Sequence, residues 1–316
     1  TKDPTILKGK GFFYVENCVL YKQAINDDGT LATTSKIVAT GSLRYVEQDE
    51  GIVLFTKDLL IGTHSSINEL WMLDKVTGVT KKIMDNAAPG SISPLGDIVT
   101  VDTDDDQLLV LARDGGGLVA KVGIQGGNSM FSPDGKKIAY IKLKDEKITM
   151  GDEDMLQGVA IYDPATGKDT LISKTEGHGK EYRLTGWSPD GKRIYFPSSN
   201  DAIWSVALDG TGKRQETNKG GVTSPFVPTY LSKLLFTDDG KTAFGEGDGI
   251  WAFRIGRNGE FLDSKKVVER DENLSLGWLE KGKSLLVRSY GGVNEETGVE
   301  LPKASTTVYY VSDLKQ

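Results

Sequence analysis

The residues of this chain that could carry out chemistry are few, and they lie far apart in the sequence. The two histidines, His64 and His178, have no second histidine or cysteine near them at a metal-ligand spacing. We therefore interpret both as solvated surface side chains rather than metal ligands. Cys18 is the single cysteine, so an internal disulfide is excluded. We expect Cys18 to be a small buried hydrophobe at the edge of a strand rather than a nucleophile.

An acidic run could supply oxygen ligands to a calcium ion. Asp102, Asp104 and Asp106 lie in a predicted hairpin turn, and alternating carboxylates can provide some of the six to eight oxygens that calcium takes. The run lacks the D-x-D-x-D-G frame of an EF-hand, and charged turns are commonly just solvated. Calcium at these three residues is therefore a hypothesis, and we predict no other cofactor.

Catalytic motifs find little support in the sequence. There is no G-x-S-x-G elbow for a serine nucleophile. The glycine-rich stretch 115–123 leads into a predicted strand rather than a helix, so it does not fit a phosphate-binding loop. We predict no catalytic residue, and a noncatalytic protein is favoured over an enzyme.

The elements that must position any site are repeats of one unit. Three stretches read FSPDGKKIAYI (131–141), WSPDGKRIYF (187–196) and FTDDGKTAFGE (236–246). Each contains an aromatic residue, a polar turn closing on glycine, a lysine and an alternating apolar run. Recurrence of such a unit about every 40–55 residues is typical of β-propeller blades.

Looser copies extend the repeat towards both ends of the chain. Degenerate turns occupy 92–102 and 278–289, and 44–56 fits less closely. A second motif, an apolar strand running into a polar turn, recurs at Tyr21, Trp71, Leu109, Ala160, Trp204, Trp251 and Tyr309. These seven copies predict an all-β fold, a single seven-bladed β-propeller of four-stranded antiparallel blades over residues 1–316. Six blades are the alternative.

The repeat resembles a known family. The aromatic-S-P-D-G-K-x-I-x-Y/F unit followed by I-Y-D-P-A-T-G-K is similar to the TolB-type propeller repeat, a relative of the WD-type repeat, mainly over 130–260. The resemblance implies a propeller used mostly in protein–protein contact, frequently in the bacterial envelope, whose repeat residues form turns and core. We expect it to come without the separate N-terminal α/β domain of TolB itself. Related metal-dependent polysaccharide lyases use several clustered histidines, and this chain has two.

Turn chemistry explains the repeat. Proline presets φ, aspartate bonds its own backbone, and glycine takes the left-handed position of the turn. Each sheet of a propeller must bury both faces, so we expect large rings to fill the space between blades. These rings are Phe131, Trp187, Phe236, Trp278, Trp71, Trp204 and Trp251. Residues 4–9 are expected to pair with the last blade and close the ring, and a first strand of their own blade is the alternative.

Loop length separates the two edges of each predicted blade. Turns between the first and second strands and between the third and fourth strands are short. Long segments join the second and third strands or successive blades, and binding residues concentrate in long loops on rigid scaffolds. The long segments are 57–68, 144–157, 173–186, 218–233 and 290–305.

We predict that the long segments contact a protein partner or a larger assembly. The candidate partner-binding residues are His64, Glu153, His178, Tyr182, Arg183, Phe226, Tyr230 and Leu301. The alternative is a small-ligand or carbohydrate-binding propeller, or a propeller enzyme that uses the central channel. Tyr182 and Arg183 are then the residues that could face the channel.

Composition limits the partners and the compartment. A net charge of −7 and a pI of about 5.1 argue against nonspecific nucleic-acid binding. No run of eighteen apolar residues occurs, so no transmembrane segment is predicted. The chain starts at Thr1, which fits a mature protein after signal removal or a trimmed chain. Together with the family resemblance, this favours a periplasmic or extracellular location, with the cytoplasm as the alternative.

Overall fold

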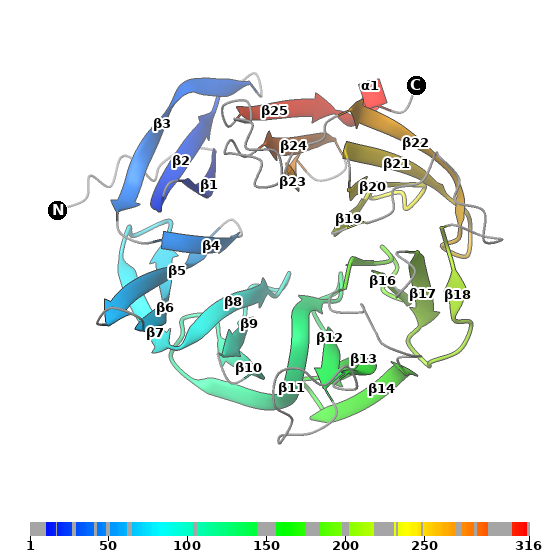
Figure 1. Ribbon diagram of the computed structural model, residues 1–316, viewed down its shortest axis with the longest axis horizontal. Coiled ribbons are helices and arrows are strands. Elements are labelled where there is room, and N and C mark those ends of the chain that lie inside the picture. Colours follow the sequence, from blue (N-terminus) through cyan, green and yellow to red (C-terminus); the bar gives the residue numbers. More distant parts are fainter. Residues whose placement is uncertain are drawn as a thin grey trace. The chain divides into compact units, whose positions relative to one another are not determined.

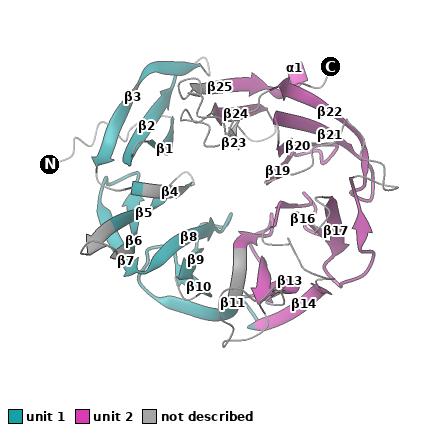
Figure 2. Ribbon diagram, viewed as in Figure 1, with its two compact units in different colours: residues 1–125, 164–167 teal, residues 126–163, 168–316 magenta. Residues whose placement is uncertain are grey.

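The computed structural model is built almost entirely of antiparallel strands, which form the seven blades of a β-propeller (Figure 1). The predicted fold class is therefore confirmed. The structure describes residues 11–16, 18–26, 30–40, 43–48, 51–61, 65–103, 106–143, 156–174, 184–197, 202–217, 231, 233–247, 249–269, 274–280, 283–289 and 305–314. The chain divides into two compact units, residues 1–125 with 164–167 and residues 126–163 with 168–316 (Figure 2).

The first unit contains three blades, which we number in chain order. Blade 1 consists of β1 (Gly11–Glu16), β2 (Val19–Ile25) and β3 (Leu31–Thr40). Blade 2 consists of β4 (Leu43–Gln48), β5 (Ile52–Ile61), β6 (Ser65–Asp74) and β7 (Thr80–Asp85). Blade 3 consists of β8 (Ala87–Ile92), β9 (Ile98–Thr103), β10 (Gln107–Ala112) and the first part of β11 (Leu118–Phe131).

The second unit contains four blades. Blade 4 consists of the last part of β11, β12 (Ile138–Leu143), β13 (Leu156–Asp163) and β14 (Lys168–Lys174). Blade 5 consists of β15 (Gly186–Trp187), β16 (Arg193–Pro197), β17 (Ile203–Ala207) and β18 (Arg214–Gln215). Blade 6 consists of β19 (Lys233–Phe236), β20 (Thr242–Glu246), β21 (Gly249–Ile255) and β22 (Phe261–Glu269). Blade 7 consists of β23 (Leu274–Glu280), β24 (Ser284–Ser289) and β25 (Ser305–Tyr310), followed by the short helix α1 (Val311–Leu314).

The S-P-D-G turns form as their sequence predicts. In blade 4 the N–H of Gly135 donates to the carbonyl of Ser132 over 2.8 Å, and Gly135 has a φ of 70°. The Ser132 hydroxyl donates to Asp134 Oδ1 over 2.6 Å. A side chain would be strained at this φ, which is why glycine closes the turn. The aspartate then fixes the turn by accepting a hydrogen bond from the serine hydroxyl.

The core lies between successive blades within each unit. In the first unit, one cluster joins blades 1 and 2 through Phe13 and Phe55, and another joins blades 2 and 3 through Leu70 and Val101. In the second unit, clusters join blade 5 to blade 6 and blade 6 to blade 7. The predicted inter-blade rings Phe131, Trp187, Phe236 and Trp251 are all buried. Burial of both faces of each sheet supplies the main hydrophobic stabilisation.

Two expectations from the sequence are wrong. Most of 57–68 is strand rather than loop, because β5 and β6 continue their pairing from Lys57–Glu69 to Ile61–Ser65. Cys18 is exposed rather than buried, since it occupies the tight turn between β1 and β2 with a φ of 60°. Trp71, Trp204 and Trp251 lie on the third strands of their blades, and Tyr21 lies on β2 of blade 1. Residues 4–9 are outside the described residues.

No helix in the described part of the chain is long and apolar enough to cross a membrane.

Candidate functional site

The predicted contact residues fall outside the part of the chain that the structure describes. His64, Glu153, His178, Tyr182, Arg183, Phe226, Tyr230 and Leu301 all lie in its gaps. The strand ends that border these gaps are nevertheless described. They fix which edge of each blade the long segments leave from.

In the second unit, the strand ends that border the long segments all lie at the corresponding edge of their blades. Segment 144–155 joins β12 to β13, and 290–304 joins β24 to β25, so each connects the second and third strands of a blade. Segments 175–183 and 218–230 connect the last strand of one blade to the first of the next. Successive antiparallel strands turn at alternate edges, so all four connections belong to one edge and the short turns to the other.

The acidic run is divided between a strand and a turn. Asp102 lies on β9, and Asp106 lies in the turn before β10 with a φ of 57°. The N–H of Asp106 donates to the carbonyl of Thr103 over 2.9 Å. Asp104 is outside the described residues. Within the described ranges no group of three or more histidine, cysteine or acidic side chains is placed to hold a metal ion.

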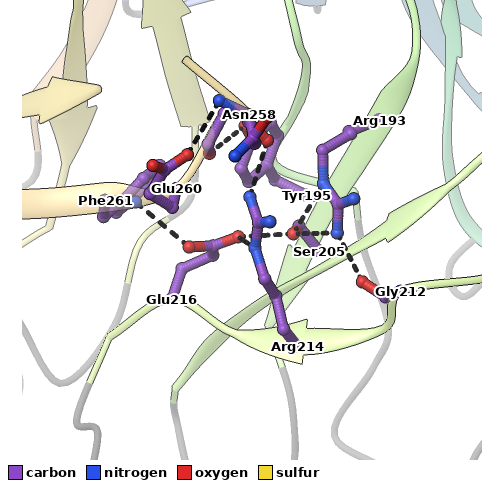
Figure 3. Close-up of polar contacts among 10 residues, drawn as sticks. Arg193, Tyr195, Ser205, Gly212, Arg214, Glu216, Asn258, Glu260 and Phe261 are labelled. Carbon is purple, nitrogen blue, oxygen red and sulfur yellow. Dashed lines mark hydrogen bonds and ion pairs between the residues drawn. The ribbon is translucent and has the colours of Figure 1, made fainter. Parts of the chain in front are cut away.

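A polar cluster occupies the short-turn edge of blades 5 and 6 (Figure 3). Its centre is Glu216, whose side chain is fully buried at the end of β18. The Ser205 hydroxyl donates to Glu216 Oε1 over 2.5 Å, and Arg214 Nε donates to the same oxygen over 2.7 Å. Glu216 Oε2 accepts the backbone N–H of Phe261, at the start of β22, over 3.1 Å. The carboxylate thus binds blade 5 to blade 6.

Two further side chains extend this cluster. Arg193 on β16 donates from Nε and Nη2 to the Ser205 hydroxyl oxygen and from Nη2 to the carbonyl of Gly212. The Tyr195 hydroxyl donates over 2.7 Å to the carbonyl of Gly259 in the turn of blade 6. Arg214 Nη2 donates to the carbonyl of Asn258 in the same turn.

Strand register explains why these side chains meet. Ser205 on β17 pairs with Arg214 on β18, and Glu216 follows Arg214 by two residues, which puts its side chain on the same face. Burial, and then the nearby Arg214 charge, lower the pKa of Arg193. Burial raises the pKa of the Tyr195 hydroxyl well above its ordinary value.

The cluster is arranged to hold blades together rather than to react. Both oxygens of Glu216 accept hydrogen bonds from protein donors, and Arg214 is engaged with Glu216 and with a backbone carbonyl. A carboxylate whose two oxygens both accept bonds from protein donors is poorly placed to take a proton from a substrate. We therefore interpret the cluster as an inter-blade lock.

Similar locks recur elsewhere in each unit. Gln48 on β4 accepts the N–H of Phe13 on β1 over 3.0 Å and donates to the Phe13 carbonyl over 2.7 Å. Asn128 on β11 exchanges the same pair of bonds with the backbone of Leu184. Glu246 on β20 accepts the N–H of Leu276 on β23 over 2.8 Å. In each case a side chain of one blade satisfies backbone groups of its neighbour.

A half-buried ion pair lies within blade 4. Lys142 on β12 forms an ion pair with Asp169 on β14. Beside it, the hydroxyl of Tyr140 and Oδ1 of Asp169 are buried and have no hydrogen-bond partner within the described part of the chain. Burial, followed by the Asp169 charge, raises the pKa of Tyr140 well above its ordinary value. The hydroxyl therefore stays protonated and does not act as a base at neutral pH.

The lock residues were not singled out from the sequence. Arg193 follows the D-G-K turn directly, and Glu216 comes four residues after the polar turn that ends at Gly212. A carboxylate two residues from Arg214, and so on the same face if the segment is extended, is the signal that could have pointed to Glu216. Its partner Phe261 lies 45 residues away, so the contact itself leaves no local pattern.

Comparison with known proteins identifies the fold and no more. No protein-family model matches the chain, and no curated protein does. An oligogalacturonate lyase in complex with manganese aligns with a TM-score of 0.52 at 15% identity, over 98% of this chain and 100% of the lyase.

Two peptidases align at similar levels. The tricorn protease has a TM-score of 0.58 at 15% identity, over 98% of this chain and 33% of its own length. The Porphyromonas gingivalis dipeptidyl peptidase 4 has a TM-score of 0.56 at 12% identity, over 99% of this chain and 51% of the peptidase. This chain therefore spans about a third and about half of the two peptidases. At these identities the likeness supports the propeller fold alone.

Proposed function

We propose that the protein is a noncatalytic recognition or assembly module that contacts a protein partner through the long segments at one edge of its blades. One observation carries this proposal: the strand order of the second unit brings 144–155, 175–183, 218–230 and 290–304 to the same edge of successive blades. The opposite edge carries short turns. Long connections on a rigid scaffold are where recognition residues are commonly found.

The rigidity of the scaffold supports the same proposal. Inter-blade locks such as Glu216–Phe261 and Asn128–Leu184 hold neighbouring blades by buried or partly buried hydrogen bonds. A contact surface assembled from several blades needs fixed spacing between them, since movement of the blades would cost binding free energy. The resemblance to the TolB-type repeat adds the expectation of a protein partner and of a periplasmic or extracellular location.

Cross-linking mass spectrometry on the protein captured from its native extract tests the proposal. We expect cross-links to one defined protein from Lys144, Lys147, Lys180 and Lys303, which lie in the long segments. Cross-links made only by Lys136, Lys192 and Lys241, which follow the short turns, would place the contact at the wrong edge.

A second measurement separates a protein partner from a small ligand. The chain is heated with and without panels of sugars, divalent metals and a chelator. A ligand that binds only the folded state raises the unfolding temperature. At a concentration one hundred times its dissociation constant, it adds about 2.7 kcal/mol to the free energy of unfolding. Such a shift, without any cross-linked protein, would replace the proposed function with small-ligand or carbohydrate binding. Calcium belongs in this panel, because the site at Asp102, Asp104 and Asp106 is a separate hypothesis.

A further inference from the structure

The turn between β21 and β22 of blade 6 carries the one Asn-Gly pair of the sequence, Asn258–Gly259. Asparagine is chemically labile before glycine, because glycine has no Cβ to hinder the approach of its backbone nitrogen to the asparagine side chain. Asn258 is exposed, and its side-chain amide makes no hydrogen bond within the described part of the chain. Asn128, by contrast, is held through both atoms of its amide by the backbone of Leu184.

Deamidation of such a pair needs only water as a co-reactant. The glycine nitrogen loses its proton and bonds to the asparagine Cγ. The bond from Cγ to the side-chain nitrogen breaks, and that nitrogen leaves as ammonia with the proton. Water then opens the succinimide ring at one of its two carbonyls, which gives aspartate or isoaspartate. In isoaspartate the backbone runs through the former side chain, and the former backbone carbonyl becomes a free carboxylate.

The folded turn opposes this reaction. The N–H of Gly259 donates to the carbonyl of Gly256 over 3.1 Å, so the nitrogen is directed across the turn rather than at the Asn258 side chain. For the nitrogen to reach Cγ, the peptide group between Asn258 and Gly259 must rotate. Arg214 Nη2 of blade 5 donates to the carbonyl of this peptide group over 2.8 Å (Figure 3). The Tyr195 hydroxyl donates to the next carbonyl, that of Gly259, over 2.7 Å. The lock between blades 5 and 6 therefore restrains the rotation.

The same lock requires a glycine after Asn258. Gly259 has a φ of 78°, and a Cβ at this position would lie 2.8 Å from the hydroxyl oxygen of Tyr195. A side chain here would push that hydroxyl away from the carbonyl to which it donates. The glycine that the lock needs is thus also the residue that makes Asn258 reactive.

The isoaspartate product does not fit the lock. Arg214 could bind the new carboxylate, but the longer backbone moves the Gly259 carbonyl away from Tyr195. Tyr195 is fully buried, so its hydroxyl would lose its acceptor without gaining water in exchange. A buried donor without a partner destabilises the folded chain. We therefore expect the modified turn to hold blade 6 to blade 5 less firmly.

We propose that Asn258 is a site of spontaneous deamidation, that the lock between blades 5 and 6 restrains the reaction, and that the isoaspartate product weakens this lock. The reaction is irreversible without a repair enzyme, so each molecule keeps a chemical record that its lock has opened. The site lies on a short turn, and it is independent of the long segments of the proposed function.

Incubation of the folded protein at mildly alkaline pH tests the proposal, because base removes the proton of the glycine nitrogen. Mass spectrometry of the digested protein measures deamidation at Asn258, and labelling by an isoaspartyl methyltransferase distinguishes isoaspartate from aspartate. The same chain unfolded in urea gives the rate without the lock, and we expect the folded protein to react more slowly. Tyr195→Phe should raise the folded rate about fivefold, equivalent to about 1 kcal/mol for one hydrogen bond.

Two further variants serve as controls. Tyr140→Phe makes the same substitution in blade 4, at a buried hydroxyl without a partner in the described ranges, and should leave the rate at Asn258 unchanged. Asn258→Ser cannot form the succinimide ring. The incubated wild-type protein should therefore unfold at a lower temperature than fresh protein, whereas Asn258→Ser should unfold at the same temperature before and after incubation.

Three outcomes would overturn the proposal. The first is that no isoaspartate forms at Asn258 in the folded protein. The second is that Tyr195→Phe reacts no faster than wild type, which would mean that the lock does not control the reaction. The third is that the isoaspartate form unfolds at the wild-type temperature. If Tyr195→Phe does not fold, the wild-type chain alone decides the second point, since equal rates in the folded and unfolded states would exclude restraint by the lock.

Discussion

The short turns of blade 3 and blade 5 have the same backbone but put their side chains to different uses. Gly115 N–H donates to the carbonyl of Ala112 over 2.8 Å, and Gly210 N–H donates to the carbonyl of Ala207 over 2.9 Å. An aspartate precedes each glycine, Asp114 in blade 3 and Asp209 in blade 5. Each aspartate accepts the N–H of the residue two positions further along, which is Gly116 in blade 3 and Thr211 in blade 5. Glycine and aspartate therefore fix the turn in both blades.

The side chains that follow these turns differ. Blade 3 continues with Leu118, Val119 and, two residues later, Lys121, all of them exposed. Blade 5 has Arg214 where blade 3 has Val119, and the buried Glu216 where blade 3 has Lys121. One turn presents an apolar surface to solvent, and the other builds a lock to the next blade. The repeat sets the backbone and leaves the use of the outer strand open.

Exchange of Arg214 and Val119, which occupy equivalent positions on the outer strands of blades 5 and 3, should give the largest effect. Arg214→Val copies blade 3 and leaves the buried Glu216 carboxylate without its closest cation. We expect a loss of about 3–5 kcal/mol, because an uncompensated buried charge is costly. The reverse change, Val119→Arg, should alter stability by less than about 0.5 kcal/mol, since Val119 is exposed. Urea denaturation measures the free energy of unfolding of both variants. If Arg214→Val lost no more of it than Val119→Arg, the lock would contribute nothing to stability.

Removal of the charge alone should cost less. Glu216→Gln keeps an oxygen that can accept the N–H of Phe261 but weakens the bond from Arg214. We expect a loss of about 1–3 kcal/mol, from a charged hydrogen bond that is only partly replaced. The double variant Arg214→Val with Glu216→Gln should lose less than the sum of the two single changes. Additive losses in the same denaturation experiment would show that the two side chains act independently.

The shared turn glycines should give intermediate effects in both blades. Gly115 has a φ of 66° and Gly210 a φ of 81°, so alanine at either position is expected to cost about 1–2 kcal/mol. A Cβ on Gly210 would lie 3.0 Å from the backbone oxygen of Ile172, whereas one on Gly115 meets the flexible end of the Ile83 side chain. Gly210→Ala should therefore have the lower melting temperature relative to wild type. The opposite order would contradict this comparison of the two turns.

The smallest effect is expected at the turn position that carries Leu95. The Ser132 hydroxyl and the N–H of Lys136 hold the pKa of Asp134, the equivalent residue of blade 4, below its ordinary value. Leu95→Asp would place a carboxylate beside the Ser93 hydroxyl, and we expect a gain of up to about 0.5 kcal/mol at this exposed site.

The gain should depend on pH in a defined direction. A carboxylate whose folded pKa is lowered stabilises the protein above its unfolded pKa of about 3.9, and this contribution is lost as the pH falls through the folded pKa. The difference in unfolding temperature between Leu95→Asp and wild type should therefore be present at neutral pH and disappear in acid. A difference that persists in acid would exclude the proposed carboxylate bond.

Much of the fold could be predicted because its signals are local. The S-P-D-G and D-P-A-T-G turns each need specific residues within a few positions, and the aromatic residue before the turn fills the gap between blades. The prediction was wrong where a local signal was misread. The sequence predicts a loop over 57–68, whereas Leu59, Leu60 and Ile61 continue the apolar strand. Cys18 was expected in the core, but the turn that holds it exposes its side chain.

By itself, the sequence determined that the chain forms antiparallel blades, favoured seven of them over six, and predicted the edge from which the long segments of the second unit leave. These follow from turn residues and alternation, which act within one hairpin. Tertiary structure alone decided that Glu216 locks blade 5 to Phe261 of blade 6, and that Gln48 of blade 2 bonds the backbone of Phe13 in blade 1. Those contacts join residues that are distant along the chain, and they form only when separate hairpins pack against one another.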